Sequence, residues 1–323
     1  MRNDKKVFVG GGAFLAVVIA TLVQTVIMAI VSNVAGSDSL AYQNWNYIIR
    51  WIVQASAVAA VFLLSKLTKT KPDNFFRKPA GISYVAAVII ALSAIAGFYL
   101  LSTLFVFGLE AIGYNFMEMS LNTPYDWIMA GISVLVFAPF CEEVLFRGSV
   151  PGSFTELTRD KKRGELWTVL LCGAAFMLMH TNPEQTVYQF LLGCMLAMLT
   201  IACRSVIPAI IVHFLNNAIA LVLSIPAFAV VDKGIAAFFT SMPALYVITA
   251  IAAAAGAVIG IYFLCRFVRK KTDARGEIVT AADEKPIVDD QAKNSGTIML
   301  AVACGVCLLL WIVNFVAAMS VVV

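Results

Sequence analysis

Apolar runs of about twenty residues recur along this chain, and they restrict its fold more than any other feature. A helix that crosses the hydrocarbon core of a bilayer needs about 20 apolar residues, because each residue advances the helix by about 1.5 Å. Nine segments reach or approach this length: 7–34, 47–67, 83–109, 126–150, 166–180, 186–203, 206–231, 244–268 and 297–321. The sequence therefore predicts an all-α, polytopic transmembrane helix bundle of eight to nine spans.

Composition places the chain among membrane proteins and excludes other classes. Hydrophobic residues make up 61% of the 323 residues and charged residues only 13%, whereas soluble domains carry about 25% charged residues. The mean hydropathy is +0.89. No basic patch interleaved with aromatic residues is present, so nucleic acid is excluded as a partner. The lipid bilayer is the predicted partner of most of the surface, and the seven cysteines, which lie in or beside apolar runs, are predicted to pack rather than to form disulfides.

The charges of the connecting loops predict the orientation in the membrane. Lysine and arginine concentrate in the even-numbered loops, whereas the odd-numbered loops carry mainly aspartate and glutamate. Because excess Lys and Arg marks cytoplasmic loops, the N-terminus is predicted to be cytoplasmic and the C-terminus to lie outside. We divide the chain into N-terminal transmembrane helices (1–125), a core that carries the chemistry (126–231), and C-terminal helices (232–323) with a flexible cytoplasmic linker at 269–296.

Polar residues inside the predicted spans form three short motifs. Ionisable groups within a membrane span are energetically unfavourable and are functional candidates for that reason. The motifs are EExxxR, FxxxH and HxxxN, and they comprise Glu142, Glu143 and Arg147, then Phe176 and His180, then His213 and Asn217. The whole chain has only two histidines, and both belong to this set.

Helical geometry predicts different roles for the two glutamates. Glu143 and Arg147 are four residues apart and share a helix face, so they can form an ion pair. Glu142 is rotated by about 100° from Glu143, and a carboxylate in a low-dielectric site has the character of a general base. Pro139, one turn earlier, lacks an N–H and predicts a local kink that would admit water beside Glu142.

The third motif places a histidine and an amide on one helix face. His213 and Asn217 are four residues apart, and together they offer donors suited to an oxyanion. His180 is suited to orient a water, transfer a proton or ligate a metal. Plainer alternatives exist for each residue alone: an ion pair that braces helices, histidines and Phe176 that only pack, and an asparagine that joins helices.

The ordered trio of motifs resembles the CPBP family of intramembrane proteases, which includes the CAAX prenyl endopeptidases and the bacterial abortive-infection or bacteriocin-immunity proteins. The resemblance covers about 127–223 and extends to Phe146-Arg147-Gly148. It implies that Glu142 is the catalytic base, that Glu143 and Arg147 support it, and that His180 helps to hold the water. It also implies that His213 and Asn217 form the oxyanion site.

The resemblance implies an intramembrane endopeptidase of the CAAX type, in a bacterial plasma membrane, whose substrate is a peptide or a membrane-anchored protein. A bound metal and a metal-free, glutamate-activated water both remain open; for Zn²⁺ the candidate ligands are Glu142, His180 and His213. Two other functions also stay open, a proton-coupled transporter and a non-catalytic immunity or adaptor protein on the same fold.

The predicted orientation can be tested by labelling. A single cysteine at Lys161 of a cysteine-free variant should react with maleimide reagents only after they gain access to the cytoplasm, because this loop is strongly basic. Labelling of intact cells by a membrane-impermeant reagent would reverse the predicted topology.

Overall fold

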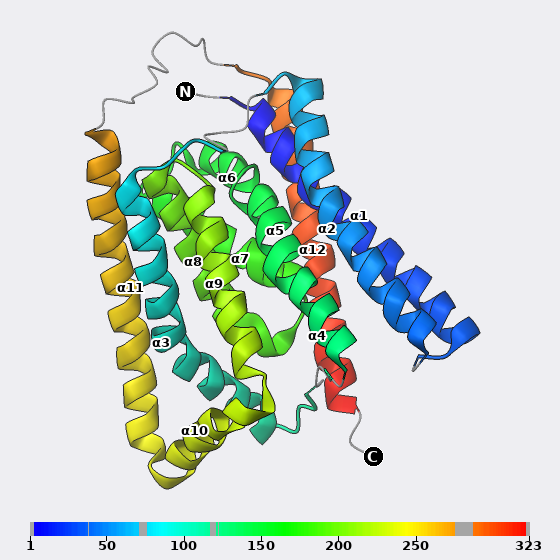
Figure 1. Ribbon diagram of the computed structural model, residues 1–323. Helices are drawn as coiled ribbons and strands as arrows, with labels where there is room; N and C mark the ends of the chain where they lie inside the picture. The colour runs from blue at the N-terminus through cyan, green and yellow to red at the C-terminus, as the bar shows by residue number, and fades with distance from the viewer. Residues whose placement is uncertain are drawn as a thin grey trace. The chain divides into compact units, whose positions relative to one another are not determined.

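The computed structural model describes residues 3–37, 39–70, 76–116, 121, 123–274 and 287–320, and within these ranges the chain is helical and contains no strand. A single isolated parallel bridge joins Asn3 to Ile287. The predicted all-α, polytopic bundle is confirmed (Figure 1). The predicted orientation of the termini stays a prediction.

Seven helical runs of the described chain are long and apolar enough to cross a membrane. They are α1 (Lys5–Ala35), α2 (Leu40–Thr68), α3 (Gly81–Ala111), the interrupted run Pro124–Thr158, Pro183–Cys203, α11 (Pro243–Asp273) and α12 (Asp290–Ser320). An eighth span results if α9 (Ile207–Leu223) and the run Pro226–Ser241, which comprises η3 (Pro226–Phe228) and α10 (Ala229–Ser241), count as one.

Two of the nine predicted segments do not form a single full-length span in the structure. The predicted helix 166–180 is α7 (Gly164–His180), whose 17 residues extend only about 25 Å, less than the hydrocarbon thickness of about 30 Å. It ends where Thr181 adopts a positive φ of 50° ahead of Asn182 and Pro183. The predicted helix 206–231 is bent by 82° between α9 and the run that begins at Pro226. The count of nine spans was therefore too high.

The helix that carries the two glutamates is interrupted, as Pro139 predicted. It consists of α4 (Pro124–Gly131), the π-helix η1 (Ile132–Phe137), α5 (Ala138–Phe146) and α6 (Val150–Thr158). A capping box between Thr123 and Asp126 starts it. The π-helix contains Leu135, whose carbonyl would otherwise accept the missing N–H of Pro139. Widened turns of this kind are frequent at functional sites.

The predicted flexible linker 269–296 is shorter than expected at both ends. Helix α11 continues to Asp273 and α12 already begins at Asp290, while residues 275–286 lie outside the described chain. Asp4 anchors the start of α12, because its N–H donates to the Ile287 carbonyl over 3.1 Å and its carboxylate accepts from the Asp289 N–H over 3.0 Å. The Asp289 carboxylate in turn caps the helix by accepting from the Ala292 N–H.

The chain forms two compact units, each made of segments distant in sequence. Unit 1 comprises Met1–Phe75, Met119–Thr168 and Thr280–Val306; unit 2 comprises Phe76–Glu118, Val169–Val279 and Cys307–Val323. The predicted division into three consecutive parts stays a prediction.

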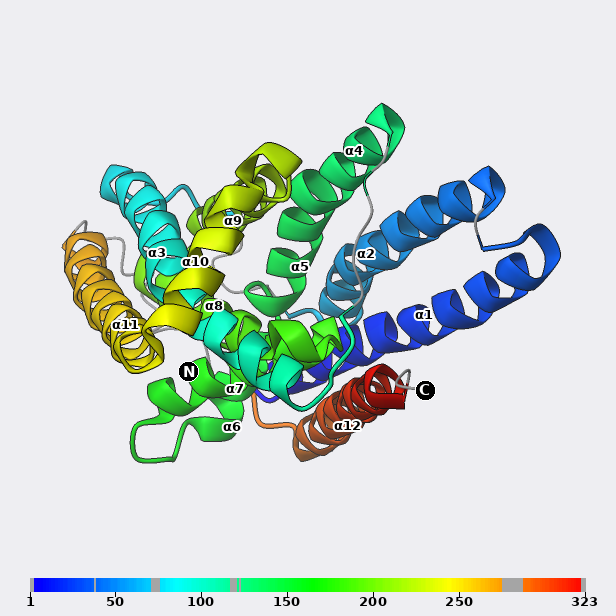
Figure 2. The same cartoon turned by 90° about the horizontal axis from the view of Figure 1, so that it is seen from below.

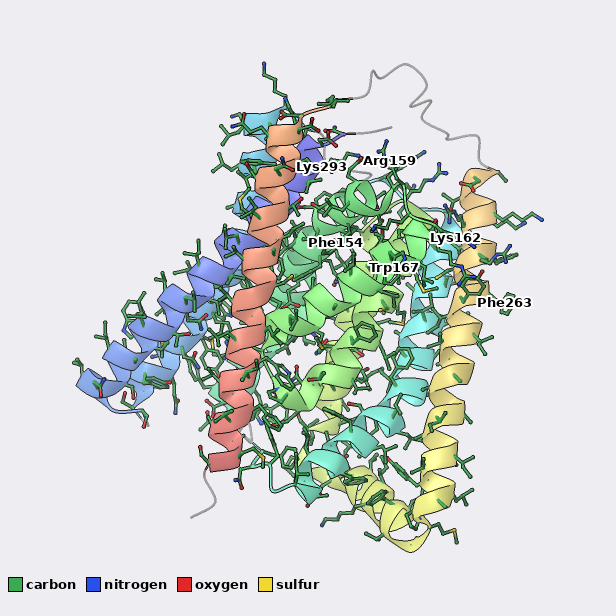
Figure 3. The ribbon with its side chains drawn as sticks, turned by 180° about the vertical axis from the view of Figure 1, so that it is seen from behind. Phe154, Arg159, Lys162, Trp167, Phe263 and Lys293 are labelled. Carbon is green, nitrogen blue, oxygen red and sulfur yellow. The ribbon has the colours of Figure 1, made fainter. Side chains whose placement is uncertain are left out.

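In unit 1, α1 packs along α2 and against α6, and the pairing of α1 with α2 is visible in two views (Figures 1 and 2). The Trp51 indole stacks on Phe137 with centroids 5.3 Å apart and donates a hydrogen bond of 2.7 Å to Ser133 Oγ. Both partners belong to the π-helix, so α2 holds the segment that precedes the glutamates. Arg159, Lys162 and Lys293 belong to this unit and are labelled in Figure 3.

In unit 2, α3 packs against α8 (Thr186–Cys203), α9 and α11. The Tyr246 hydroxyl donates to the Leu100 carbonyl over 3.0 Å and is fully buried with its ring. Gly173 of α7 lies against Phe190 and Cys194 of α8 so closely that a side chain there would overlap them. These contacts fix α7, α8 and α9, which carry the second and third motifs.

The packing of α12 on α1 predicts a difference between two glycines of the same helix. A methyl group at Gly296 would overlap the backbone of Val7 and Phe8, whereas nothing lies within 4 Å of one at Gly305. Gly296→Ala should therefore lower the free energy of unfolding by about 1–3 kcal/mol. The matched control Gly305→Ala should be neutral or stabilise by up to about 1 kcal/mol, because alanine favours the helix. Unfolding of the two variants in detergent checks this; equal stability would contradict the close α1–α12 contact.

Candidate functional site

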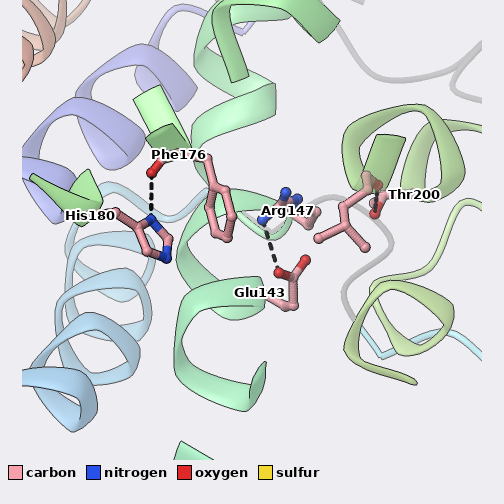
Figure 4. Close-up of polar contacts among 6 residues, drawn as sticks. Glu143, Arg147, Phe176, His180 and Thr200 are labelled. Carbon is pink, nitrogen blue, oxygen red and sulfur yellow. Dashed lines mark hydrogen bonds and ion pairs between the residues drawn. The ribbon is translucent and has the colours of Figure 1, made fainter. Parts of the chain in front are cut away.

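The first motif forms a buried ion pair within α5. Arg147 Nη1 lies 2.9 Å from Glu143 Oε1, and both side chains are 0% exposed (Figure 4). The predicted i,i+4 pairing is confirmed. Arg147 is also the residue at which the helix ends, since its N–H and that of Gly148 both donate to the Glu143 carbonyl. Glu143 therefore engages Arg147 through its backbone and its side chain.

Glu142 occupies a different environment from its neighbour. Its side chain is partly exposed, whereas Glu143 is completely buried. This difference follows from the rotation of about 100° between successive helical residues. Of the two glutamates, Glu142 is therefore the less buried residue, although its Oε2 atom is itself buried.

His180 is the last residue of α7, and its tautomer follows from one hydrogen bond. Nδ1 lies 2.8 Å from the Phe176 carbonyl oxygen (Figure 4). A carbonyl only accepts, so Nδ1 carries the proton, and in the neutral ring Nε2 holds the lone pair. His180 thus has the form required of a proton acceptor or a ligand. The FxxxH spacing matters because it places the Phe176 carbonyl one turn before the imidazole.

Phe176 brings the two histidines of the chain onto one aromatic ring. Its ring packs edge-on against His180, with centroids 4.7 Å apart, and against His213, with centroids 5.8 Å apart. Phe176 is fully buried and His213 is 3% exposed. The predicted supporting position of Phe176 is therefore a packing contact that fixes both imidazoles, on α7 and on α9.

A chain of hydrogen bonds orients Asn217. The Tyr188 hydroxyl donates to Asn216 Oδ1, and Asn216 Nδ2 donates to Asn217 Oδ1 over 3.3 Å. Because the Asn217 oxygen accepts a bond, its amide group has a defined orientation with the N–H donors on the opposite side. Sequence reasoning missed Tyr188 and Asn216 as part of this site; Asn216 is adjacent in sequence, whereas Tyr188 lies on α8 and carries no motif.

A cavity of about 590 Å³ lies within unit 2 beside this chain. It is lined by α3, by η2 (Pro183–Gln185) and the first turn of α8, by α9 and by α10. Asn217, Asn216 and Tyr188 line it, together with apolar residues such as Phe107, Ile219 and Leu223. Asn217 therefore contacts a space large enough for a ligand.

The structure thus assembles the predicted residues as two groups. Glu142, Glu143 and Arg147 lie together on α5 of unit 1. The residues Phe176, His180, His213 and Asn217 lie in unit 2, where α7 and α9 hold them.

The candidate zinc ligands are divided between the two units: Glu142 lies in unit 1, and His180 and His213 lie in unit 2. Within the ranges that the structure describes, no group of three or more His, Cys, Asp or Glu side chains that could hold a metal ion is found. The metalloprotease interpretation is therefore not supported, and zinc binding by this set stays a prediction.

Comparison with known families supplies an independent observation. Residues 124–219 match the family model of the type II CAAX prenyl endopeptidase Rce1-like proteins. The match contains all three motifs and agrees closely with the predicted extent of the resemblance, 127–223. It is consistent with a CPBP-family protease and supports an intramembrane protease in general. No curated protein and no solved structure matches the chain.

The two glutamates should differ in their effect on stability. Glu143→Gln removes the negative charge that faces Arg147 and should lower the free energy of unfolding by about 3–5 kcal/mol, as for other broken buried pairs. Glu142→Gln, at a partly exposed position, should leave stability within about 1 kcal/mol of the unchanged protein. Unfolding in mixed detergent micelles measures both. Equal losses would contradict the assignment of structural support to Glu143 alone.

Proposed function

We propose that this protein is an intramembrane endopeptidase that hydrolyses a peptide bond of a membrane-associated substrate with a water activated by Glu142. One observation carries the proposal: the segment that matches the Rce1-like family model, 124–219, contains every residue of the three motifs. Two substrate classes follow from the family resemblance, a CAAX-type protein and a bacteriocin or other peptide precursor.

Glu142 supplies the general base in this mechanism. It takes a proton from the water, and the resulting hydroxide attacks the carbonyl carbon of the scissile bond. Protonated Glu142 then delivers that proton to the departing amine, so the products are a carboxylic acid and an amine, which become a carboxylate and an ammonium group by exchanging a proton. Glu142 is less buried than Glu143, which favours it over Glu143 for this role. The buried Glu143–Arg147 pair holds the end of α5 in place beside it.

Asn217 and His213 stabilise the negative charge that develops on the carbonyl oxygen. The amide N–H donors of Asn217 are directed away from Asn216, because the Asn217 oxygen is already an acceptor. Donors that are fixed in advance stabilise an oxyanion without reorganising during the reaction. His213 is held against Phe176 and provides a second N–H donor four residues from Asn217.

His180 orients the attacking water. Its Nδ1 donates to the Phe176 carbonyl, so in the neutral ring we assign the hydrogen bond from the water to the Nε2 lone pair. We favour activation by Glu142 without metal, since Asn217 beside His213 suits an anion better than a cation and asparagine is seldom a zinc ligand.

The activity can be tested by comparing cells that carry the unchanged protein with cells that carry Glu142→Gln. Mass spectrometry of membrane peptides should find cleavage products only with the unchanged protein. With a substrate identified in this way, Asn217→Ala should lower kcat by about 10²–10³, the usual effect of one oxyanion donor. Glu110→Gln, an exposed position on α3, should leave the rate unchanged.

Two results would contradict the proposal. Full processing by Glu142→Gln would exclude this glutamate as the base. Elemental analysis of the active preparation that finds about one zinc per chain, lost together with activity on chelation, would overturn the metal-free mechanism.

A further inference from the structure

The cavity in unit 2 combines an apolar wall with acidic residues, and none of its described lining residues is basic. Apolar residues of α3, α9 and α10 form most of its surface, among them Ile95, Val106, Ile219 and Ile235. Among the described residues, the charged side chains of the lining are Glu184 of η2 and Asp232 of α10. A ligand that complements this lining has an apolar group together with a positive charge.

Asp232 is held where its charge acts on the cavity. Its Oδ1 accepts a hydrogen bond of 2.6 Å from the Tyr99 hydroxyl, which joins α10 to α3, and both residues line the cavity. The neighbouring Lys233 is not part of the lining and is rotated by about 100° around the helix. Tyr99 is a neutral donor, so this contact brings no cation to Asp232.

The cavity lining also contains side-chain amide groups. Asn217, Asn216, Gln185 and Gln189 are lining residues. Gln189 Nε2 donates to Gln185 over 3.2 Å, whereas Gln189 Oε1 is buried and accepts no hydrogen bond from the described residues. A buried acceptor without a donor is unfavourable, and a backbone N–H of a bound peptide would satisfy it. Side-chain amides offer donors and acceptors that match a peptide backbone.

We propose that this cavity binds the segment of a peptide substrate in which a lysine or arginine adjoins a large apolar side chain. The identification of that peptide as the substrate rests on the proposed endopeptidase function, because Asn217 belongs to both sites. The apolar side chain lies against α3 and α9, the cation faces Asp232 and Glu184, and the backbone meets the amide groups. A cavity of about 590 Å³ is within the usual range of about 300–1,000 Å³ for sites that hold ligands of this size.

Direct binding tests the proposal separately from proteolysis. The protein is Glu142→Gln, reconstituted in nanodiscs of zwitterionic phosphatidylcholine so that the lipid does not attract cations. Three fluorescent peptides are compared, and they differ at a single position. The residue that follows a leucine is Lys in the first, Gln in the second and Glu in the third. By fluorescence anisotropy the Lys peptide should bind about threefold more tightly than the Gln peptide and about tenfold more tightly than the Glu peptide, and salt should weaken the preference.

Variants at the acidic positions locate the preference. Asp232→Asn combined with Glu184→Gln should abolish it, while the asparagine oxygen can still accept from Tyr99. Glu110→Gln, outside the cavity lining, should retain it. Ala236→Phe enlarges a lining residue and should lower the affinity for all three peptides by a similar factor. Unfolding measurements on each variant confirm that it is folded.

Three results would overturn the proposal: equal affinity for the three peptides, a preference that survives in the Asp232/Glu184 double variant, or equal binding of a peptide with an alkyl chain in place of lysine. The last would assign the cavity to an aliphatic chain. A fourth result separates binding from proteolysis: Glu142→Gln binds the Lys peptide selectively, but the protein with Glu142 intact does not cleave it. That result would count against this peptide as a substrate and would still support the binding site.

Discussion

The Arg147 guanidinium is a full charge in a run of helix apolar enough to cross a membrane, and its side chain is completely buried. A charge in such a place must be neutralised close by, because neither lipid nor an apolar protein interior solvates it. Glu143, one turn earlier on the same helix, does so over 2.9 Å. Glu143 is thereby committed to the ion pair, which is why the proposed base is the neighbouring carboxylate, Glu142. The π-helix η1 precedes α5, and Trp51 contacts this π-helix. Together they determine the direction in which α5 continues.

The polar groups of unit 2 obey the same constraint by hydrogen bonding. Two of the candidate side chains on α7 and α9 have a neighbour that fixes their donor pattern: the Phe176 carbonyl for His180, and Asn216 for Asn217. In the proposed mechanism such fixed donors would need no reorganisation as charge develops. Phe176 positions the two imidazoles, since its ring packs against both.

The features that sequence predicted are those that depend on local spacing. The pairing of Glu143 with Arg147 follows from the helical period. The distortion near Pro139 follows from its missing N–H, and most of the spans follow from the length of the apolar runs. The bend after α9 was missed because apolar residues continue on both sides of it, although Pro226 marks the break. The role of Tyr188 could not be predicted, because it reaches Asn216 only through the packing of α8 on α9. The polar start of α12 was predicted to be a linker, but a distant partner, Asp4, anchors the segment where the helix begins.

The position of Asn217 couples recognition to chemistry. Its amide is proposed to stabilise the oxyanion, and it also lines the cavity that would hold the peptide. A peptide bound there has a backbone carbonyl beside the amide before any reaction begins, and such positioning can replace part of the entropy loss of the chemical step. Asn216 then affects both functions, because it orients the Asn217 amide and lines the same cavity. Loss of its hydrogen bond would change substrate affinity and turnover together, whereas loss of the Asp232 charge would change affinity for basic peptides alone.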